Sequence, residues 1–473
     1  MVFSSLLFIY IFLPVNLLCY AVISDIKKKN ICLLVFSLMF YAWTSPKYLL
    51  VMMFMALINY MGALWVEHFR NSRKSGYILA ADIAASLCIL AFFKYLGFIC
   101  EISRFITGVP KIIPQVLLPV GISFYTFQLI SYVVDVYRGE VKADTQYWKV
   151  LLYASLFHQC IAGPIVRYKD IKDDLRERKT GIDDMNEGIS RFTTGLAKKT
   201  LLANTCASIV DSVLPESIAQ LGSVTVLGSW FGMLLYALQI YLDFSAYSDM
   251  AIGLGRIFGF HFLENFNYPY ISKSITEFWR RWHISLGSWF RDYVYIPLGG
   301  SRKGKLILVR NLIIVWLLTG IWHGASWNFV IWGLMFGILL IIEKLWLGKY
   351  IEKLPNIFKR LYVIFIVMIS FIIFNAGTMK EAFTNISGLF GANSTCIIND
   401  YTIYYLRSYL ITIIIAIIGA TPILKNIIEK LKTKSVMNKI INILEPIAMV
   451  IIILIVTAYL VDNSYNPFLY FRF

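Results

Sequence analysis

The amino-acid sequence predicts an all-α polytopic membrane protein, and three observations support this prediction. Of the 473 residues, 58% are hydrophobic and only 15% are charged, and the mean hydropathy is +0.68. Apolar runs of membrane-spanning length recur along the whole chain. The basic residues stand in short segments between these runs, so the net charge of +16 fits cytoplasmic loops at an anionic lipid surface. We therefore expect a multi-pass protein of the cell membrane that contacts lipid and binds no nucleic acid.

About eleven spans are expected, because a spanning helix needs roughly 20 apolar residues and shorter runs suit re-entrant or interfacial helices. The longest run is long enough for two spans. The apolar runs lie near residues 3–23, 31–44, 48–66, 77–99, 113–136, 148–166, 228–258, 306–346, 360–376, 402–423 and 442–461. We interpret the whole chain, residues 1–473, as one membrane domain, with N-terminal spans in 1–110, a core in 113–346 and C-terminal spans in 360–473.

The positions of the basic residues give an orientation. Lys27, Lys28 and Lys29 belong on the cytoplasmic side, which places the N-terminus outside. If every following apolar run crossed the membrane, the strongly basic segment 167–179 would lie outside, against the rule that basic loops face the cytoplasm. Part of residues 113–166 is therefore expected not to cross the membrane. Gly163 and Pro164 favour a turn or a broken helix there.

The seven cysteines are scattered, odd in number and mostly inside apolar runs. No pair has metal-ligand spacing, so the sequence indicates neither a disulfide framework nor a zinc site. We expect no metal and no tightly bound cofactor.

Of the five histidines, His323 stands out because it lies within "WLLTGIWHGASW", about seventeen residues into an apolar run. The run follows the basic residues Arg302, Lys303 and Lys305, so it starts in the cytoplasm and carries His323 deep into the membrane or toward its outer half. Desolvation there would favour the neutral imidazole, which is able to act as a general base. Its flanking glycines let a substrate or another backbone approach closely. A hydrogen-bonded structural histidine is the alternative.

A second histidine, His283, lies in a polar and aromatic stretch between apolar runs. If residues 277–292 form one helix, Trp279, His283 and Phe290 share a stripe. Such a helix is too polar to span, and it fits a half-inserted element that lines a polar cavity. Its arginines could bind the phosphate of a donor molecule, or they could simply contact lipid phosphates.

Two carboxylates, Asp243 and Asp249, fall inside another apolar run. Ionisable residues within a membrane are candidates for function. Asp243 could instead pair with an arginine of the stretch around His283 and act as structural support.

Several ordered motifs of this chain resemble the core of the membrane-bound O-acyltransferase family. They are "DFSAYSDMAIGLGRIFGF", "EFWRRWHISLGSWFRDYVYIPLGGSRKGK" and "TGIWHGASWNFVIWG". Upstream, "LPVGISFYTFQ" and "IAGPIVRY", and at the end "NPFLYFRF", are similar to the family's bacterial polysaccharide branch. The string "RDYVYIPLGGSRKG" looks most like the alginate and peptidoglycan O-acetyltransferases. The resemblance covers the chain from about residue 92 to its end.

The resemblance implies a fold, a reaction and a set of site residues. The fold would be a ring of spanning helices around a thin centre pierced by a tunnel. His323 matches the family's essential intramembrane histidine, and His283 matches its second histidine. The remaining candidates, for contact with the donor or for lining the tunnel, are Trp279, Arg280, Arg281, Trp282, Arg291, Asp292, Tyr241, Asp243, Trp322 and Asn328.

The reaction implied is transfer of an acyl group, most simply acetyl, from a cytoplasmic thioester toward an extracytoplasmic cell-envelope polysaccharide. The donor would be acetyl-CoA or an acyl-carrier thioester, used as a substrate. Members of this branch commonly act with a secreted or membrane-anchored acyltransferase of the SGNH-hydrolase type. The chain departs from the branch at Asn375, where an arginine is expected.

Two other functions remain open at this point. The same enzyme class includes transfer of D-alanine to teichoic acid. A transporter of a small solute or ion would fit the intramembrane Asp243 and the broken helices, although the sequence has no internal inverted symmetry and a transporter does not require the motifs around His283 and His323.

Overall fold

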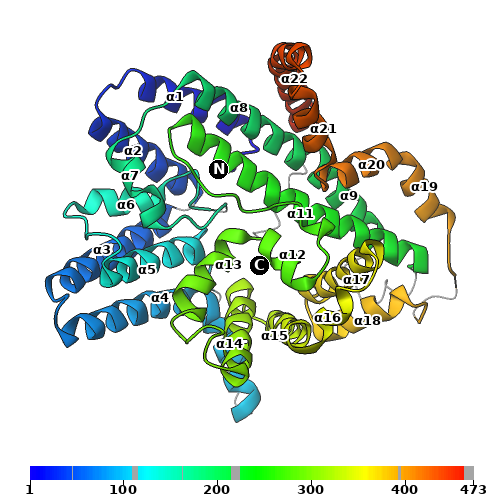
Figure 1. Ribbon diagram of the computed structural model, residues 1–473, viewed down its shortest axis with the longest axis horizontal. Coiled ribbons are helices and arrows are strands. Elements are labelled where there is room, and N and C mark those ends of the chain that lie inside the picture. Colours follow the sequence, from blue (N-terminus) through cyan, green and yellow to red (C-terminus); the bar gives the residue numbers. More distant parts are fainter. Residues whose placement is uncertain (45, 109–115, 162, 215–223, 393–395, 463–473) are drawn as a thin grey trace. The chain divides into compact units, whose positions relative to one another are not determined.

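The structure, a computed structural model, describes residues 1–44, 46–108, 116–161, 163–214, 224–392 and 396–462, and every regular element within them is a helix (Figure 1). The predicted all-α class is therefore confirmed. Contacts divide the chain into two compact units. The first unit comprises residues 1–192, 250–264 and 288–297, and the second comprises residues 193–249, 265–287 and 298–473.

The first unit is built mainly from the N-terminal helices, and α3 (Pro46–His68) packs against both α4 (Arg73–Thr107) and α5 (Ile122–Arg138). A close approach fixes the start of α5. Gly121 has φ 74°, and a Cβ atom there would lie 2.0 Å from the carbonyl oxygen of Cys160, so only glycine fits. The remaining helices of this unit are α1 (Leu13–Ala21), α2 (Ile26–Thr44), α6 (Tyr147–Ser155), α7 (Tyr168–Arg176) and most of α8 (Ile182–Ala197).

The apolar run 148–166 does not form a spanning helix. Helix α6 ends at Ser155, and the described residues between it and Tyr168 are not helical. Gly163 has φ 141°, a conformation that favours glycine. The break predicted at Gly163 and Pro164 is confirmed.

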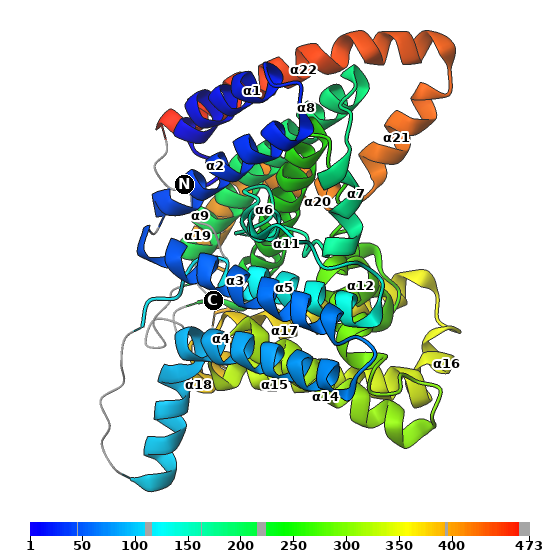
Figure 2. The same ribbon diagram turned by 90° about the vertical axis from the view of Figure 1, so that its left-hand side faces the viewer.

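The second unit contains the C-terminal helices, of which α14 (Lys305–His323), α15 (Trp327–Ile342), α17 (Asn356–Asn375) and α18 (Met379–Leu389) pack in succession (Figure 2). Three helices continue from one unit into the other: α8, α11 (Val226–Ile257) and α13 (Ile284–Phe290). The others are α9 (Asn204–Val213), α12 (Ile275–Arg281), α16 (Gly348–Ile351), α19 (Asp400–Ser408), α20 (Leu410–Gly419), α21 (Ile423–Lys432) and α22 (Ser435–Asp462).

Glycines bring the backbones of α14 and α15 into direct contact. A Cβ atom at Gly333 would lie 2.4 Å from the carbonyl oxygen of Trp316, and a Cβ atom at Gly320 would lie 2.4 Å from that of Phe329. Gly324 faces the ring of Phe329, and its Cβ atom would lie 2.1 Å from that ring. Gly320 and Gly324, which flank His323, therefore allow α15 to approach closely. Close approach of another backbone is one of the two roles predicted for these glycines.

Seven described helices are long and apolar enough to cross a membrane, or eight if the bent pair α19 and α20 forms one span. The expected count of about eleven is not confirmed. The run 113–136 yields the 17-residue α5, and α2 carries three lysines in its first turns. The seven helices are 46–68, 73–107, 226–257, 305–323, 327–351, 356–375 and 435–462.

Candidate active site

His323 is the last residue of α14 and sits among aromatic rings in the second unit. Its imidazole is partly exposed and lies edge-on to Trp332 and Phe374, with ring centroids 5.0 and 5.1 Å apart. The helix stops there because the next residue, Gly324, is extended. The surroundings of His323 are therefore mostly apolar, as the sequence predicted.

Trp279 of α12 anchors the second motif to the same aromatic cluster. Its ring centroid lies 4.6 Å from Trp316, 4.8 Å from Phe336 and 5.6 Å from Trp332. Trp332 thus contacts both Trp279 and His323. The aromatic character of the stretch serves to fasten α12 to α14 and α15.

His283 lies in a sharp break between α12 and α13. The predicted single helix over 277–292 is wrong, because α12 ends at Arg281 and His283 has φ 46°, a left-handed conformation rare for a residue other than glycine. The side chain is buried, and its Nδ1 has no hydrogen-bond partner within the described ranges. Burial lowers the pKa of His283 to about 4, so the imidazole is neutral at physiological pH.

The segment before α12 holds this break in place, through a residue that the sequence analysis did not single out. Asn265 accepts hydrogen bonds at its carbonyl oxygen from the Ile284 amide (2.9 Å) and at Oδ1 from the Ser285 hydroxyl (2.9 Å) and amide (3.2 Å). Its Nδ2 donates to Ser248 of α11 at 3.0 Å. An asparagine in a non-helical stretch carries no sequence signal for this role; only the fold reveals it.

The two histidines share one aromatic neighbour. The Trp322 ring centroid lies 4.9 Å from that of His323 and 6.0 Å from that of His283, edge-on to both. The structure therefore brings His283, Trp322 and His323 together. This agrees with the site expected from the motifs, although the roles of these residues stay predictions.

The arginines of the motif differ in their surroundings. Arg281 donates to the Glu277 carboxylate at 2.9 Å and to the carbonyl oxygen of Asn267 at 3.1 Å. Arg280 is exposed, and its guanidinium has no hydrogen-bond or ion-pair partner among the residues that the structure covers. Arg280 is therefore the cation of α12 whose guanidinium no described residue engages.

Arg291 and Asp292 belong to the first unit. Asp292 accepts from Arg167 Nη1 and from Arg291 Nε, each at 2.7 Å. Burial would raise the pKa of Asp292, but these two arginines hold it below its usual value. Asp292 is thus a partner in an ion-pair network.

Asp243 of α11 pairs with a lysine. Its carboxylate lies 2.7 Å from Lys199 Nζ, and both side chains are almost completely buried. Asp249 likewise lies 2.7 Å from Lys198 Nζ. Consecutive lysines thus neutralise the two intramembrane carboxylates, and the suggested partner for Asp243 among the motif's arginines is wrong. Such a pair is costly to break from one side.

Tyr241 and Trp282 are both buried, and their ring centroids lie 6.2 Å apart. Phe266 lies beside both of them, at 6.2 and 5.2 Å. These two candidates therefore belong to the aromatic packing next to His283.

Asn328 closes the C-terminal end of α17. Its Nδ2 donates to the carbonyl oxygens of Ala376 (2.8 Å) and Ile373 (3.3 Å), and its Oδ1 accepts from the Ser326 hydroxyl. This fastens α17 beside α15 and holds Phe374 against His323. Asn328 therefore acts as a support in the structure.

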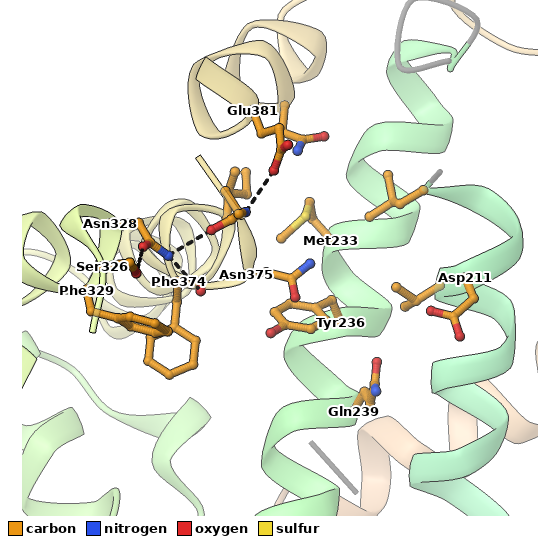
Figure 3. A pocket seen from close by; sticks show the side chains of 16 residues that line it. Asp211, Met233, Tyr236, Gln239, Ser326, Asn328, Phe329, Phe374, Asn375 and Glu381 are labelled. Atoms are coloured by element: carbon orange, nitrogen blue, oxygen red, sulfur yellow. Dashed lines mark hydrogen bonds between the residues drawn. The ribbon is translucent and has the colours of Figure 1, made fainter. Parts of the chain in front are cut away.

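A cavity of about 570 Å³ with a mixed polar and apolar lining lies beside Phe374, within the second unit (Figure 3). Tyr236 and Gln239 project into it from α11, and Asn375 follows Phe374 at the end of α17. Asn328 is a lining residue too. The lining residues are Val210, Asp211, Leu214, Met233, Tyr236, Gln239, Ser326, Asn328, Phe329, Ile372, Phe374, Asn375, Ala376, Gly377, Glu381 and Asn385.

Comparison with known proteins agrees with this architecture. Residues 140–376 match the model of the membrane-bound O-acyltransferase family, and the chain belongs to that family. It is a multi-pass membrane enzyme, an O-acyltransferase.

Named relatives point to one branch. The chain is 40% identical over 399 residues to a probable alginate O-acetylase of Pseudomonas aeruginosa, covering 82% of this chain and 75% of the relative. It is 32% identical over 427 residues to a peptidoglycan O-acetyltransferase of Helicobacter pylori, covering 83% and 80%. It is 28% identical over 303 residues to a teichoic acid D-alanyltransferase of Bacillus subtilis, covering 61% and 74%. The final motif, "NPFLYFRF", lies outside the described residues.

Proposed function

We propose that this enzyme takes an acetyl group from a cytoplasmic thioester and transfers it to a hydroxyl group at the outer face of the membrane, for O-acetylation of a cell-envelope polysaccharide of the alginate or peptidoglycan type. One observation carries the proposal. His323 stands at the end of α14 opposite its basic residues and touches Phe374, which lines the cavity.

Charge supports this orientation of the second unit. Helix α14 starts at Lys305, directly after Arg302 and Lys303, and α17 carries Lys359 and Arg360 in its first turns. Basic helix ends face the cytoplasm. The 18-residue separation from Lys305 to His323 corresponds to a rise of about 27 Å, close to the thickness of the hydrocarbon core. His323 and the cavity then belong to the outer side.

The proposed chemistry requires one base. Neutral His323 takes the proton of the acceptor hydroxyl, whose oxygen attacks the thioester carbonyl carbon. The new C–O ester bond forms, the C–S bond breaks, and the leaving thiolate recovers the proton. On the donor side, His283 contributes an uncharged hydrogen-bonding group, and Arg280 contacts a phosphate of acetyl-CoA or of the acyl-carrier thioester.

Acetyl is favoured over D-alanyl by the relatives. The two named for O-acetyl transfer match at 40% and 32% identity over more than four-fifths of the chain, whereas the D-alanyltransferase matches at 28% over 61%.

We also propose a second acyltransferase outside the membrane. The cavity has room for a group about the size of a sugar residue, not for a long polymer strand. A secreted or membrane-anchored partner would then distribute acetyl groups along the polysaccharide.

The experiment that tests the proposed function compares wild type with His323→Ala in cells lacking the native gene. Loss of a general base lowers transfer about 10²–10⁴-fold, so envelope O-acetyl groups should disappear while the membrane level of the protein stays normal. His261→Ala is the matched control, because His261 is half-exposed and distant in sequence from both motifs. Normal acetylation in the His323→Ala strain would exclude the proposed role.

A further inference from the structure

The cavity of the second unit is lined in part by side-chain amides, those of Gln239, Asn328, Asn375 and Asn385. The side-chain amides of Gln239, Asn375 and Asn385 form no hydrogen bond with any residue that the structure describes. Gln239 is only 5% exposed, and Figure 3 shows its amide within the cavity between Tyr236 and Asp211. A buried amide without a partner is costly. This arrangement therefore points to a ligand that supplies the missing hydrogen bonds.

The charge of the lining restricts what that ligand is. Among the described residues that line the cavity, Asp211 and Glu381 are acidic, and none is a lysine or an arginine. Glu381 also accepts from the Gly377 amide at 2.7 Å, so its carboxylate is fixed at the wall. The C-terminal end of α17, where helix carbonyls concentrate negative potential, points to the same place. An anionic group entering the cavity would meet negative potential and no cation.

We propose that this cavity is the acceptor site and that it selects an uncharged, hydroxyl-bearing group over an anionic one such as a uronate. The proposal rests on the proposed function and adds the chemical class of the immediate acceptor. Each amide both donates and accepts, which matches a hydroxyl group that does the same. A carboxylate needs donors or cations instead, and it would be repelled by Asp211 and Glu381. A uronate polymer would then receive acetyl only through an uncharged carrier group.

The side chain at position 375 determines much of the proposed preference for an uncharged over an anionic acceptor. Asn375 is exposed at the cavity wall, next to Phe374, which contacts His323. An arginine there would place a cation on the path of the acceptor and offer two parallel donors to a carboxylate. Asn375→Arg should therefore reverse the preference, whereas Asn375→Gln keeps an amide and serves as the matched control.

The test measures occupancy of the cavity and not acyl transfer. Leu214 lines the cavity without a polar role. Leu214→Cys, in a background with the exposed Cys88 and Cys396 changed to Ser, therefore reports access for a membrane-impermeant maleimide. Purified protein in vesicles is labelled with and without N-acetylglucosamine or glucuronate at about 100 mM, because a single sugar binds weakly. The same measurement in a His323→Ala background keeps the result independent of catalysis.

N-acetylglucosamine should slow labelling at least about threefold, the effect of two-thirds occupancy, and glucuronate should leave the rate unchanged. Asn375→Arg should show protection by glucuronate. If that variant does not fold, Asp211→Asn replaces it and should narrow the difference between the sugars. Equal protection of the wild type by both sugars, stronger protection by glucuronate, or protection by neither overturns the proposal. Because His323 is not needed for protection, these outcomes are separate from failure of the transfer assay.

Discussion

At the scale of single residues, the backbone at His283 is the most informative feature. A non-glycine residue with φ 46° stores about 1–3 kcal/mol of strain, and such residues cluster at functional sites. Hydrogen bonds that Ile284 and Ser285 donate to Asn265 maintain the conformation. Because burial lowers the pKa of His283 to about 4, the imidazole is uncharged at pH 7 and does not supply a cation for a donor phosphate. In the proposed function, that task belongs to an arginine.

Arg280 is the arginine whose loss should affect the donor. Arg280→Ala should raise the apparent KM for the thioester about fivefold with a smaller change in kcat, since an exposed charge contact contributes about 1 kcal/mol. Arg281→Ala is the matched control and should have the weaker effect on KM, because Glu277 already engages its guanidinium. The measurement is initial rate against donor concentration in vesicles. Equal KM values for Arg280→Ala and wild type would leave Arg280 as a lipid contact.

At the scale of elements, a buried carboxylate fastens the start of α12 to two spanning helices. Glu343, 5% exposed, accepts from the amides of Ile275 (2.7 Å) and Thr276 (2.9 Å) and from the Thr276 hydroxyl (2.8 Å). The Tyr362 hydroxyl donates to it at 3.2 Å. A negative charge at a helix N-terminus is favourable. Glu343 therefore fixes where α12 begins, and with it the position of Trp279.

Glu343→Ala should destabilise the protein by about 2–3 kcal/mol, because it leaves buried donors without an acceptor. Thr276→Val removes one of the same bonds and should cost about 1 kcal/mol. Thermal unfolding in detergent measures both. A midpoint for Glu343→Ala equal to that of wild type would mean that α12 does not depend on this contact.

The close crossing of α14 and α15 leaves no space for a side chain at Gly333. A Cβ atom at Gly333 would lie 2.4 Å from a backbone oxygen, and backbone cannot rotate away as a side chain does. Gly333→Ala should cost about 1–3 kcal/mol by overpacking and should reduce transfer by shifting His323. Gly419→Ala is the control, since its Cβ atom would lie 3.8 Å from Leu202, an ordinary contact. Stability and transfer rate should change only for Gly333→Ala; similar behaviour of the two variants would contradict the close crossing.

At the scale of the whole molecule, the sequence predicted the helical class and the positions of the two histidines. Long apolar runs and ordered motifs can be recognised without knowing how the side chains pack. The sequence did not predict the break at His283, since the polar and aromatic pattern of 277–292 fits one helix. The turn depends on hydrogen bonds that Ile284 and Ser285 donate to Asn265. The sequence likewise did not predict Lys199 as the partner of Asp243 or the amides of the cavity. Those groups are distant in sequence and meet only in the folded chain.

The proposed second acyltransferase outside the membrane can be tested by reconstitution. Purified enzyme in vesicles, with labelled acetyl-CoA on the side where α14 and α17 begin and polysaccharide on the other, should transfer little label to the polymer. Addition of a secreted acyltransferase to the polymer side should restore transfer, because the cavity of about 570 Å³ admits one small group and no polymer strand. His323→Ala is the control and should stay inactive with the partner present. Efficient labelling of the polymer by the enzyme alone would refute the partnership, and it would require that the polysaccharide itself reach the cavity beside Phe374.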